Sequence, residues 1–223
     1  MNSTVVLAME LNEVEIDADQ LSTNFVTSES RLEGNVILRH QGMVLRCGLA
    51  EIFPKSETNN SPRYELSKQL ALVQETTDYS LSAQAGEAIY LPTQDQLTLI
   101  EKVYFQYNQA TDGFLIEAEN LQIILKEGTV SQLISSGAPS RFSQTVSDKT
   151  VVIEAKGIKW DTDTRIATLE EASLDDGATT FSASMIEYNT ATGAISAQGR
   201  GDDRPKYRFN SATEKQEDDD NDT

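Results

Sequence analysis

The sequence predicts an all-β protein built from repeated strand units. Apolar residues make up 38% of the 223 positions, and Val, Ile, Leu, Tyr and Phe are spread evenly instead of gathering in helical blocks. A pattern of two-residue spacings recurs along the chain, and turns rich in Gly, Asn, Asp and Ser separate its copies. The length is compatible with a single β domain.

The recurring pattern combines a small residue with a one-residue slip. Its clearest copy, at the end of the segment 134–160, places Ile153, Ala155, Ile158 and Trp160 at spacings of two, three and two. Because side chains alternate between the faces of a strand, this slip indicates a β-bulge or a change of face. The small residue suggests that two layers approach closely there. A chance match to a loose pattern remains the alternative.

Taken in order, the chain holds three copies of this pattern, over residues 16–52, 81–123 and 153–188. Turn-rich joints lie between and within them, at 54–63, Asp112–Gly113, 175–177 and Thr192–Gly193. Turn chemistry at such short intervals predicts many short antiparallel strands. Helical character is arguable only at 64–73, where the alternation of Leu70 and Leu72 favours a strand.

The formal charge of −18 restricts the possible partners. Residues 214–223 hold six acids and one lysine, so they supply −5 and leave −13 on the body. Such a charge disfavours nucleic acids and anionic membranes. The negative charge either keeps the protein soluble or provides a docking surface for a basic partner. We predict an N-terminal lead over 1–13, one domain over 14–209, and an acidic disordered tail over 210–223.

The sequence holds few signals of the compartment in which the protein works. Cys47 is the only cysteine, which excludes an intramolecular disulfide and a thiolate metal cluster. The apolar run from Val5 to Met9 is too short for a secretory signal. No segment reaches the roughly 18 apolar residues of a spanning helix. A cytoplasmic protein and one whose signal was removed both stay open.

Catalytic motifs are missing from the sequence, and no cofactor is expected. There is no Gly-x-Ser-x-Gly elbow, phosphate-binding glycine loop or His-rich metal spacing. We predict a surface or turn position for His40, the single histidine. The acid pairs Asp161/Asp163, Asp175/Asp176 and Asp202/Asp203 are predicted in turns, with weak calcium binding as an alternative.

Three segments carry a resemblance to a known family. GAPSRFSQ at 137–144, the opening from Ile16 to Cys47, and the segment from Ile153 to Gly199 resemble the LptA/OstA-like family of periplasmic lipopolysaccharide-transport bridge proteins. The resemblance covers roughly residues 14–209. Two departures stand out: residues 56–118 contain an extra or enlarged unit compared with short members, and Cys47 replaces a usual small residue.

The resemblance implies a β-jellyroll of two antiparallel sheets forming an open V-shaped trough. Inward apolar residues would then hold the acyl chains of an amphiphile. Alternatively, they pack on one another as an ordinary core. The candidate lining residues are Leu32, Val36, Leu38, Leu99, Val103, Phe105, Ile123, Phe142, Ile153, Trp160, Leu169 and Tyr188.

The function implied by the resemblance is non-enzymatic carriage of lipopolysaccharide across the periplasm. The expected partners are lipopolysaccharide itself and LptC-like and LptD-like components of the inner and outer membranes, joined by strand addition at free sheet edges. End-to-end homo-oligomers are also possible, and no nucleic acid is expected. Two rivals remain: a structural or adhesive β-repeat module that binds protein, and a carbohydrate-processing enzyme.

Overall fold

The computed structural model describes residues 14–55, 61–109, 113–137, 139–146, 149–175, 179–201 and 203–209. These residues form one antiparallel sheet of 16 strands, and their only helix is the short 3-10 turn η1 (Pro92–Gln94). The all-β prediction is therefore confirmed, and 64–73 lies in a strand. The strands are β1 (Glu15–Asp17), β2 (Gln20–Thr23), β3 (Ser30–His40), β4 (Met43–Phe53), β5 (Arg63–Glu75), β6 (Tyr79–Leu91), β7 (Gln96–Gln109), β8 (Phe114–Lys126), β9 (Thr129–Ser136), β10 (Ser140–Val146), β11 (Lys149–Ala155), β12 (Gly157–Asp161), β13 (Ile166–Asp175), β14 (Thr179–Asn189), β15 (Ile195–Gln198) and β16 (Lys206–Phe209).

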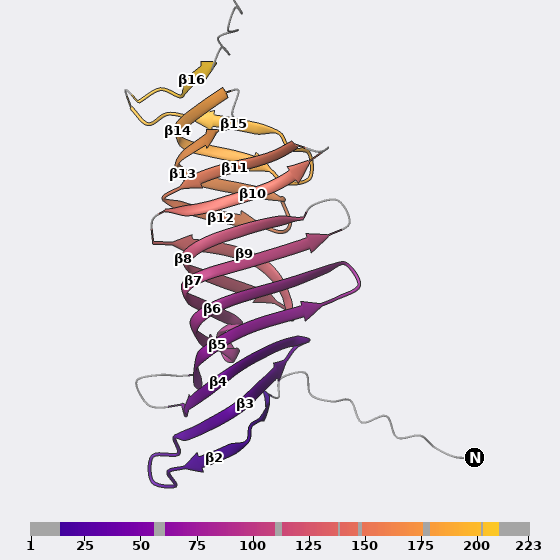
Figure 1. Cartoon of the computed structure of the whole chain (residues 1–223), viewed down its shortest axis with the longest axis vertical. Coiled ribbons are helices and arrows are strands. Elements are labelled where there is room, and N and C mark those ends of the chain that lie inside the picture. The colour runs from indigo at the N-terminus through magenta and orange to yellow at the C-terminus, as the bar shows by residue number, and fades with distance from the viewer. Residues whose placement is uncertain are drawn as a thin grey trace, which may run out of the picture.

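The strands stack along the long axis of the molecule in nearly the order of the chain (Figure 1). At one end β1 and β2 pair only with β3, and at the other end β15 and β16 pair only with β14. Within the described part of the chain, these four short strands form the two free edges of the sheet. The edges lie at opposite ends of the stack.

A line of bulges, which we call the crease, crosses the sheet. The residue pairs Gly34–Asn35, Lys68–Gln69 and Glu101–Lys102 have positive φ, at intervals of 34 and 33 residues. The strand register shifts at each pair. Because a bulge adds length to one strand and bends it, aligned bulges on β3, β5 and β7 fold the whole sheet. Glu171, also at positive φ, continues the crease in β13.

The crease divides the sheet into two halves. Half-sheet I holds β2, β9, β12 and β15 with residues 30–33, 49–53, 63–67, 87–91, 96–100, 120–126, 166–170 and 185–189 of the long strands. Half-sheet II holds β1, β10, β11 and β16 with the other halves of the same strands. Thus β9 with β10, and β11 with β12, each replace one long strand broken at the crease.

The two half-sheets face each other across a shared interior. The ring centroids of Tyr107 in half-sheet II and Trp160 in half-sheet I are 5.0 Å apart, and those of Phe142 and Tyr188 are 5.4 Å apart. This is the predicted β-jellyroll, and its two layers are halves of one continuous sheet. The predicted slip between Ala155 and Ile158 is confirmed as the break between β11 and β12.

Close contacts at the crease require glycine at particular positions. A Cβ atom on Gly48 would lie 2.9 Å from the Cβ of Lys68, and one on Gly86 would lie 2.9 Å from the Cβ of Glu101. Both neighbours are bulge residues. The bulge therefore presses its side chain against the adjacent strand, where no side chain fits.

Some predictions lie outside the described residues. These include the lead over 1–13, the tail over 210–223 and parts of the turns at 112 and 176–177. The domain boundaries at residues 14 and 209 also stay predictions. No helix in the described ranges is long and apolar enough to span a membrane.

The crease predicts a local response to added volume. Gly86→Ala should lower the free energy of unfolding by about 1–3 kcal/mol, because its Cβ would overlap the Cβ of Glu101. The matched control is Gly157→Ala, whose nearest neighbour is the carbonyl oxygen of Ser135 at 3.7 Å. Urea denaturation should show no loss for this control. Equal losses in both variants would contradict the crowding at the crease.

Candidate functional site

The twelve predicted lining residues all lie in the interior, and none is more than 5% exposed. They belong to one continuous hydrophobic cluster. Six come from half-sheet I (Leu32, Leu99, Ile123, Trp160, Leu169 and Tyr188) and six from half-sheet II (Val36, Leu38, Val103, Phe105, Phe142 and Ile153). The structure places these residues together, and their contact with a ligand stays a proposal.

An aromatic cluster occupies the interior where β7, β8, β10, β12 and β14 face one another. Trp160 lies with its ring centroid 4.9 Å from that of Phe114 and 5.0 Å from that of Tyr107. Phe142 contacts Phe114 at 5.4 Å and Tyr188 at the same distance. These contacts join the two half-sheets, so the interior is filled by side chains in this structure.

Opposite the crease, the strand ends of the two half-sheets meet along a line that we call the mouth. No backbone ladder crosses the mouth in the described residues. Instead, among the described residues, polar side chains of half-sheet II reach the backbone or side chains of half-sheet I at three places. We call these contacts the N-terminal, central and C-terminal clasps.

The N-terminal clasp is a hydrogen bond between Nδ1 of His40 and the hydroxyl of Tyr90. His40 is only 4% exposed, so a surface position is wrong, but it does lie at the end of β3 directly before the turn at 41–42. Burial lowers the pKa of His40, although the charge of Asp95 opposes this effect. Burial likewise raises the pKa of the Tyr90 hydroxyl. The sequence pattern missed that His40 falls on the inward side of its strand, two residues after Leu38.

The central clasp joins Gln74 and Tyr79 of half-sheet II to the start of β9 in half-sheet I. Nε2 of Gln74 donates to the carbonyl oxygen of Gly128 at 2.6 Å. The hydroxyl of Tyr79 donates to Oε1 of Gln74 at 2.9 Å and accepts from the backbone N–H of Val130 at 3.0 Å. Every polar atom of these two side chains therefore has a partner, as buried polar groups require.

The C-terminal clasp is centred on Thr190, which is buried after the end of β14. Its carbonyl oxygen accepts from Nε2 of Gln144 at 2.8 Å, and its hydroxyl accepts from Nε1 of Trp160 at 3.4 Å. Oε1 of Gln144 and the hydroxyl of Tyr188 are buried without a hydrogen-bond partner. A buried polar group without a partner lowers stability by about 1–3 kcal/mol. The hydrogen bonding of this clasp is therefore less complete than that of the central clasp.

Sequence reasoning missed the glutamines of the clasps, although a signal was available. Gln74 lies two residues after Leu72, and Gln144 lies two residues after Phe142. Both occupy inward positions of an apolar alternation, where a polar residue needs a partner. A polar residue at the last inward position of a strand marks the mouth.

Of the three acid pairs, only Asp161/Asp163 lies wholly within the described residues, at the end of β12 and in the turn that follows it. Asp161 is the last residue of β12, and its carboxylate accepts from the backbone N–H and hydroxyl of Thr164, both at 3.0 Å. This turn hydrogen bonding lowers the pKa of Asp161. In the described ranges, no group of three or more His, Cys, Asp or Glu residues could hold a metal ion.

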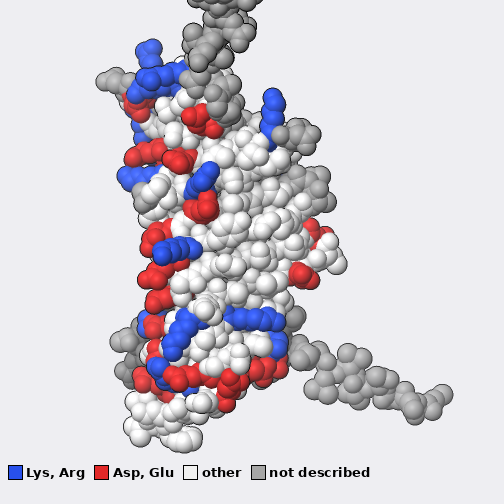
Figure 2. Space-filling model, in the orientation of Figure 1, with Lys and Arg blue, Asp and Glu red and all other residues white. Residues whose placement is uncertain are grey.

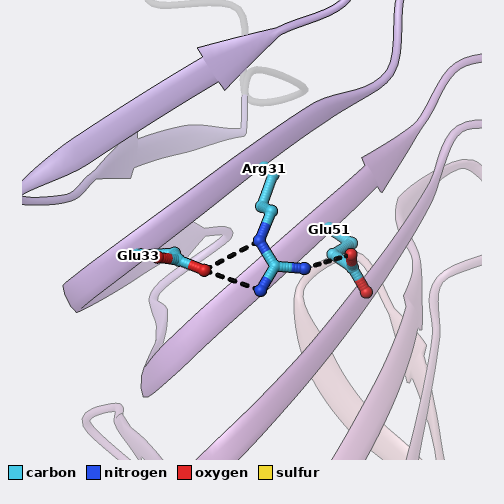
Figure 3. A network of polar contacts seen from close by, with 3 residues as sticks. All are labelled: Arg31, Glu33 and Glu51. Atoms are coloured by element: carbon cyan, nitrogen blue, oxygen red, sulfur yellow. Dashed lines mark hydrogen bonds and ion pairs between the residues drawn. The ribbon is translucent and has the colours of Figure 1, made fainter.

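Figure 2 shows acidic and basic side chains at both ends of the stack, and the balance between them differs in the sequence. Residues 14–29 contain four acids and no base, whereas residues 195–209 contain four basic and two acidic residues. Near the N-terminal end, Arg31 bonds Glu33 on its own strand and Glu51 on β4, with nitrogen–oxygen distances of 2.6 and 2.8 Å (Figure 3). Two carboxylates thus pair with one guanidinium, so this group of three residues keeps a net negative charge.

The buried state of His40 predicts a pH dependence of stability. The folded-state pKa lies below the ordinary value of 6.5, so the unfolded chain binds a proton first as the pH falls. Stability from neutral His40 is complete above pH 6.5 and declines below it, by at most about 1.4 kcal/mol per pH unit. Urea unfolding at pH 7.5 and 5.5 should show wild type losing more stability than His40→Gln. A larger loss in the variant would contradict this sign.

Comparison with known proteins places this architecture in a family. The family described as "LptA/(LptD N-terminal domain) LPS transport protein" matches residues 15–114 and 112–194. Among solved structures, the chain is similar to LptH, the LptA homologous periplasmic component of the lipopolysaccharide transport device from Pseudomonas aeruginosa. The TM-score is 0.51 at 16% identity, over 58% of this chain and 94% of that chain. No curated protein matches. Because the family match covers more than half of its length, the chain belongs to the LptA/(LptD N-terminal domain) family of lipopolysaccharide transport proteins.

Proposed function

We propose that this protein is a non-enzymatic carrier that holds the acyl chains of lipopolysaccharide between its half-sheets and helps to bridge the two membranes. One observation carries the proposal: the apolar cluster is continuous from β3 to β14, along nearly the whole stack. Among the described residues no Lys, Arg, Asp or Glu is buried. An acyl chain would therefore meet apolar surface along the length of the fold.

The energy of binding follows from the same cluster. Each methylene moved from water into such an interior contributes about 0.8 kcal/mol. Because side chains fill the interior, the chain would have to replace contacts between the half-sheets. The mouth is the place where this costs least, since it is held by a few side-chain hydrogen bonds while the crease is bridged by strand pairing.

Partners at the two ends follow from the free edges and their charges. The acidic N-terminal edge exposes Leu21, and the basic C-terminal edge exposes Ile195 and Tyr207. Opposite charges and exposed apolar side chains suit strand addition between the C-terminal edge of one molecule and the N-terminal edge of the next. LptC-like and LptD-like components, or a second copy, would provide the neighbouring edges in the periplasm.

A structural module that binds protein is the second candidate. The filled interior favours it, because close packing of Phe114, Phe142 and Trp160 stabilises a β fold without any ligand. The two functions differ in whether an amphiphile is retained. Lipid binding therefore decides between them.

Lipid retention is tested by placing a charge on either side of one strand. Val103 and Tyr104 are neighbours on β7; Val103 is buried, and Tyr104 is 44% exposed on the outer face. Native mass spectrometry with lipid A should show wild type and Tyr104→Asp retaining lipid. Val103→Asp should retain at least tenfold less, because a carboxylate is costly to bury.

Circular dichroism must show both variants to be folded at the temperature of the lipid measurement. If folded wild type retains no lipid A, the protein-binding module becomes the better interpretation. Equal retention by folded Val103→Asp and Tyr104→Asp would exclude the interior as the site.

End-to-end assembly is tested at the basic edge. The double variant Lys206→Glu/Arg208→Glu should weaken self-association at low salt, because it removes the charge complementarity of the two ends. The control Lys126→Glu/Lys159→Glu makes the same change of net charge at exposed sites away from the edges. Sedimentation velocity should detect a difference, and identical behaviour of the two variants would argue against edge pairing.

A further inference from the structure

The C-terminal clasp offers unused hydrogen-bonding capacity inside the mouth. The described residues contain three buried side-chain atoms without a partner: Oε1 of Gln41, Oε1 of Gln144 and the hydroxyl of Tyr188. Gln41 is only half-buried and lies in a turn, so a small movement of its side chain lets Oε1 accept a hydrogen bond from water. Gln144 is 2% exposed and Tyr188 is fully buried. These two belong to one place in the fold.

The two unpartnered groups lie above the aromatic cluster. The ring of Tyr188 packs against Phe142 with centroids 5.4 Å apart, and Gln144 is the next inward residue after Phe142 on β10. The hydroxyl of Tyr188 lies 3.9 Å from where a Cβ of Gly193 would be, in the turn that follows β14. Gln144 reaches the same turn through its bond to Thr190. Both oxygens therefore lie at the rim, and the apolar interior begins below them.

The central clasp provides the contrast. The amide of Gln74 and the hydroxyl of Tyr79 are both hydrogen-bonded within the clasp, so a ligand would gain nothing there without breaking existing bonds. At the C-terminal clasp a ligand can add hydrogen bonds to atoms that lack them. The gain is larger than in water-exposed sites because the groups are already desolvated.

We propose that the C-terminal clasp binds the polar root of an acyl chain, with a ligand hydroxyl or amide bonding Oε1 of Gln144 and the hydroxyl of Tyr188. The amide oxygen of Gln144 accepts, and the phenol of Tyr188 donates or accepts. One group that both donates and accepts satisfies the pair. The chain attached to it then passes inward onto Phe142 and Trp160. This inference rests on the proposed carrier function and adds a position and a chemical preference to it.

Two fatty acids that differ by one hydroxyl test the preference. Dodecanoate and 3-hydroxydodecanoate carry the same charge and the same chain, so the negative charge of the protein affects both equally. Wild type should bind the hydroxylated acid about tenfold more tightly. Tyr188→Phe removes one oxygen without changing the ring, and it should bring the affinity ratio close to one. Gln144→Leu should do the same.

The control is Tyr90→Phe, which removes a hydroxyl at the N-terminal clasp. Since that hydroxyl is bonded to His40, the variant should lower the melting temperature and leave the affinity ratio unchanged. The hydroxyl of Tyr188 has no hydrogen-bond partner, so Tyr188→Phe should not lower the melting temperature. A ratio that stays at the wild-type value in Tyr188→Phe overturns the site, while retained binding of dodecanoate leaves the carrier function intact. If wild type retains lipid A but binds neither acid, the site at the C-terminal clasp is overturned and the carrier function stands; if it retains no lipid A either, both proposals fail.

Discussion

The crease is the constraint on which the rest of the structure depends. A 13-residue strand such as β5 would extend about 43 Å if it ran straight. Paired residues at positive φ bend β3, β5 and β7 at the same level, so each long strand serves both layers. Bending brings the two apolar faces together and leaves the strand ends opposite the bend. The interior, the mouth and the free edges all follow from this one repeated irregularity.

The sequence predicts the crease on some strands and hides it on others. On β4 and β8 the inward residues flanking the crease are three apart, Cys47 to Ala50 and Ala118 to Leu121, and this slip was recognised. On β3 and β7 they are four apart, Leu32 to Val36 and Leu99 to Val103. A spacing of four preserves the alternation of an unbroken strand, so the bulges themselves were hidden. Pairing of the halves into a V came only from the family resemblance.

The inward residues were predictable because alternation alone selects them, and this explains why all twelve candidates are buried. The clasps were not predicted, because they depend on which strand ends face each other across the mouth. Gln74 meets Gly128 over a separation of 54 residues, and Gln144 meets Thr190 over 46. No local pattern contains such pairs. The inward position of His40 does follow from alternation, two residues after Leu38, but its partner Tyr90 lies three strands away.

A filled interior and a carrier function are compatible when the two sides of the fold differ in strength. Strand pairing runs through the crease on both flanks of every bulge, so opening there would break several backbone hydrogen bonds per strand. At the mouth, three clasps hold the rims, and each depends on one or two side chains. Separation of the rims therefore needs fewer broken bonds and exposes apolar faces that an acyl chain can cover again. The fold thus directs any opening to the side opposite its bulges.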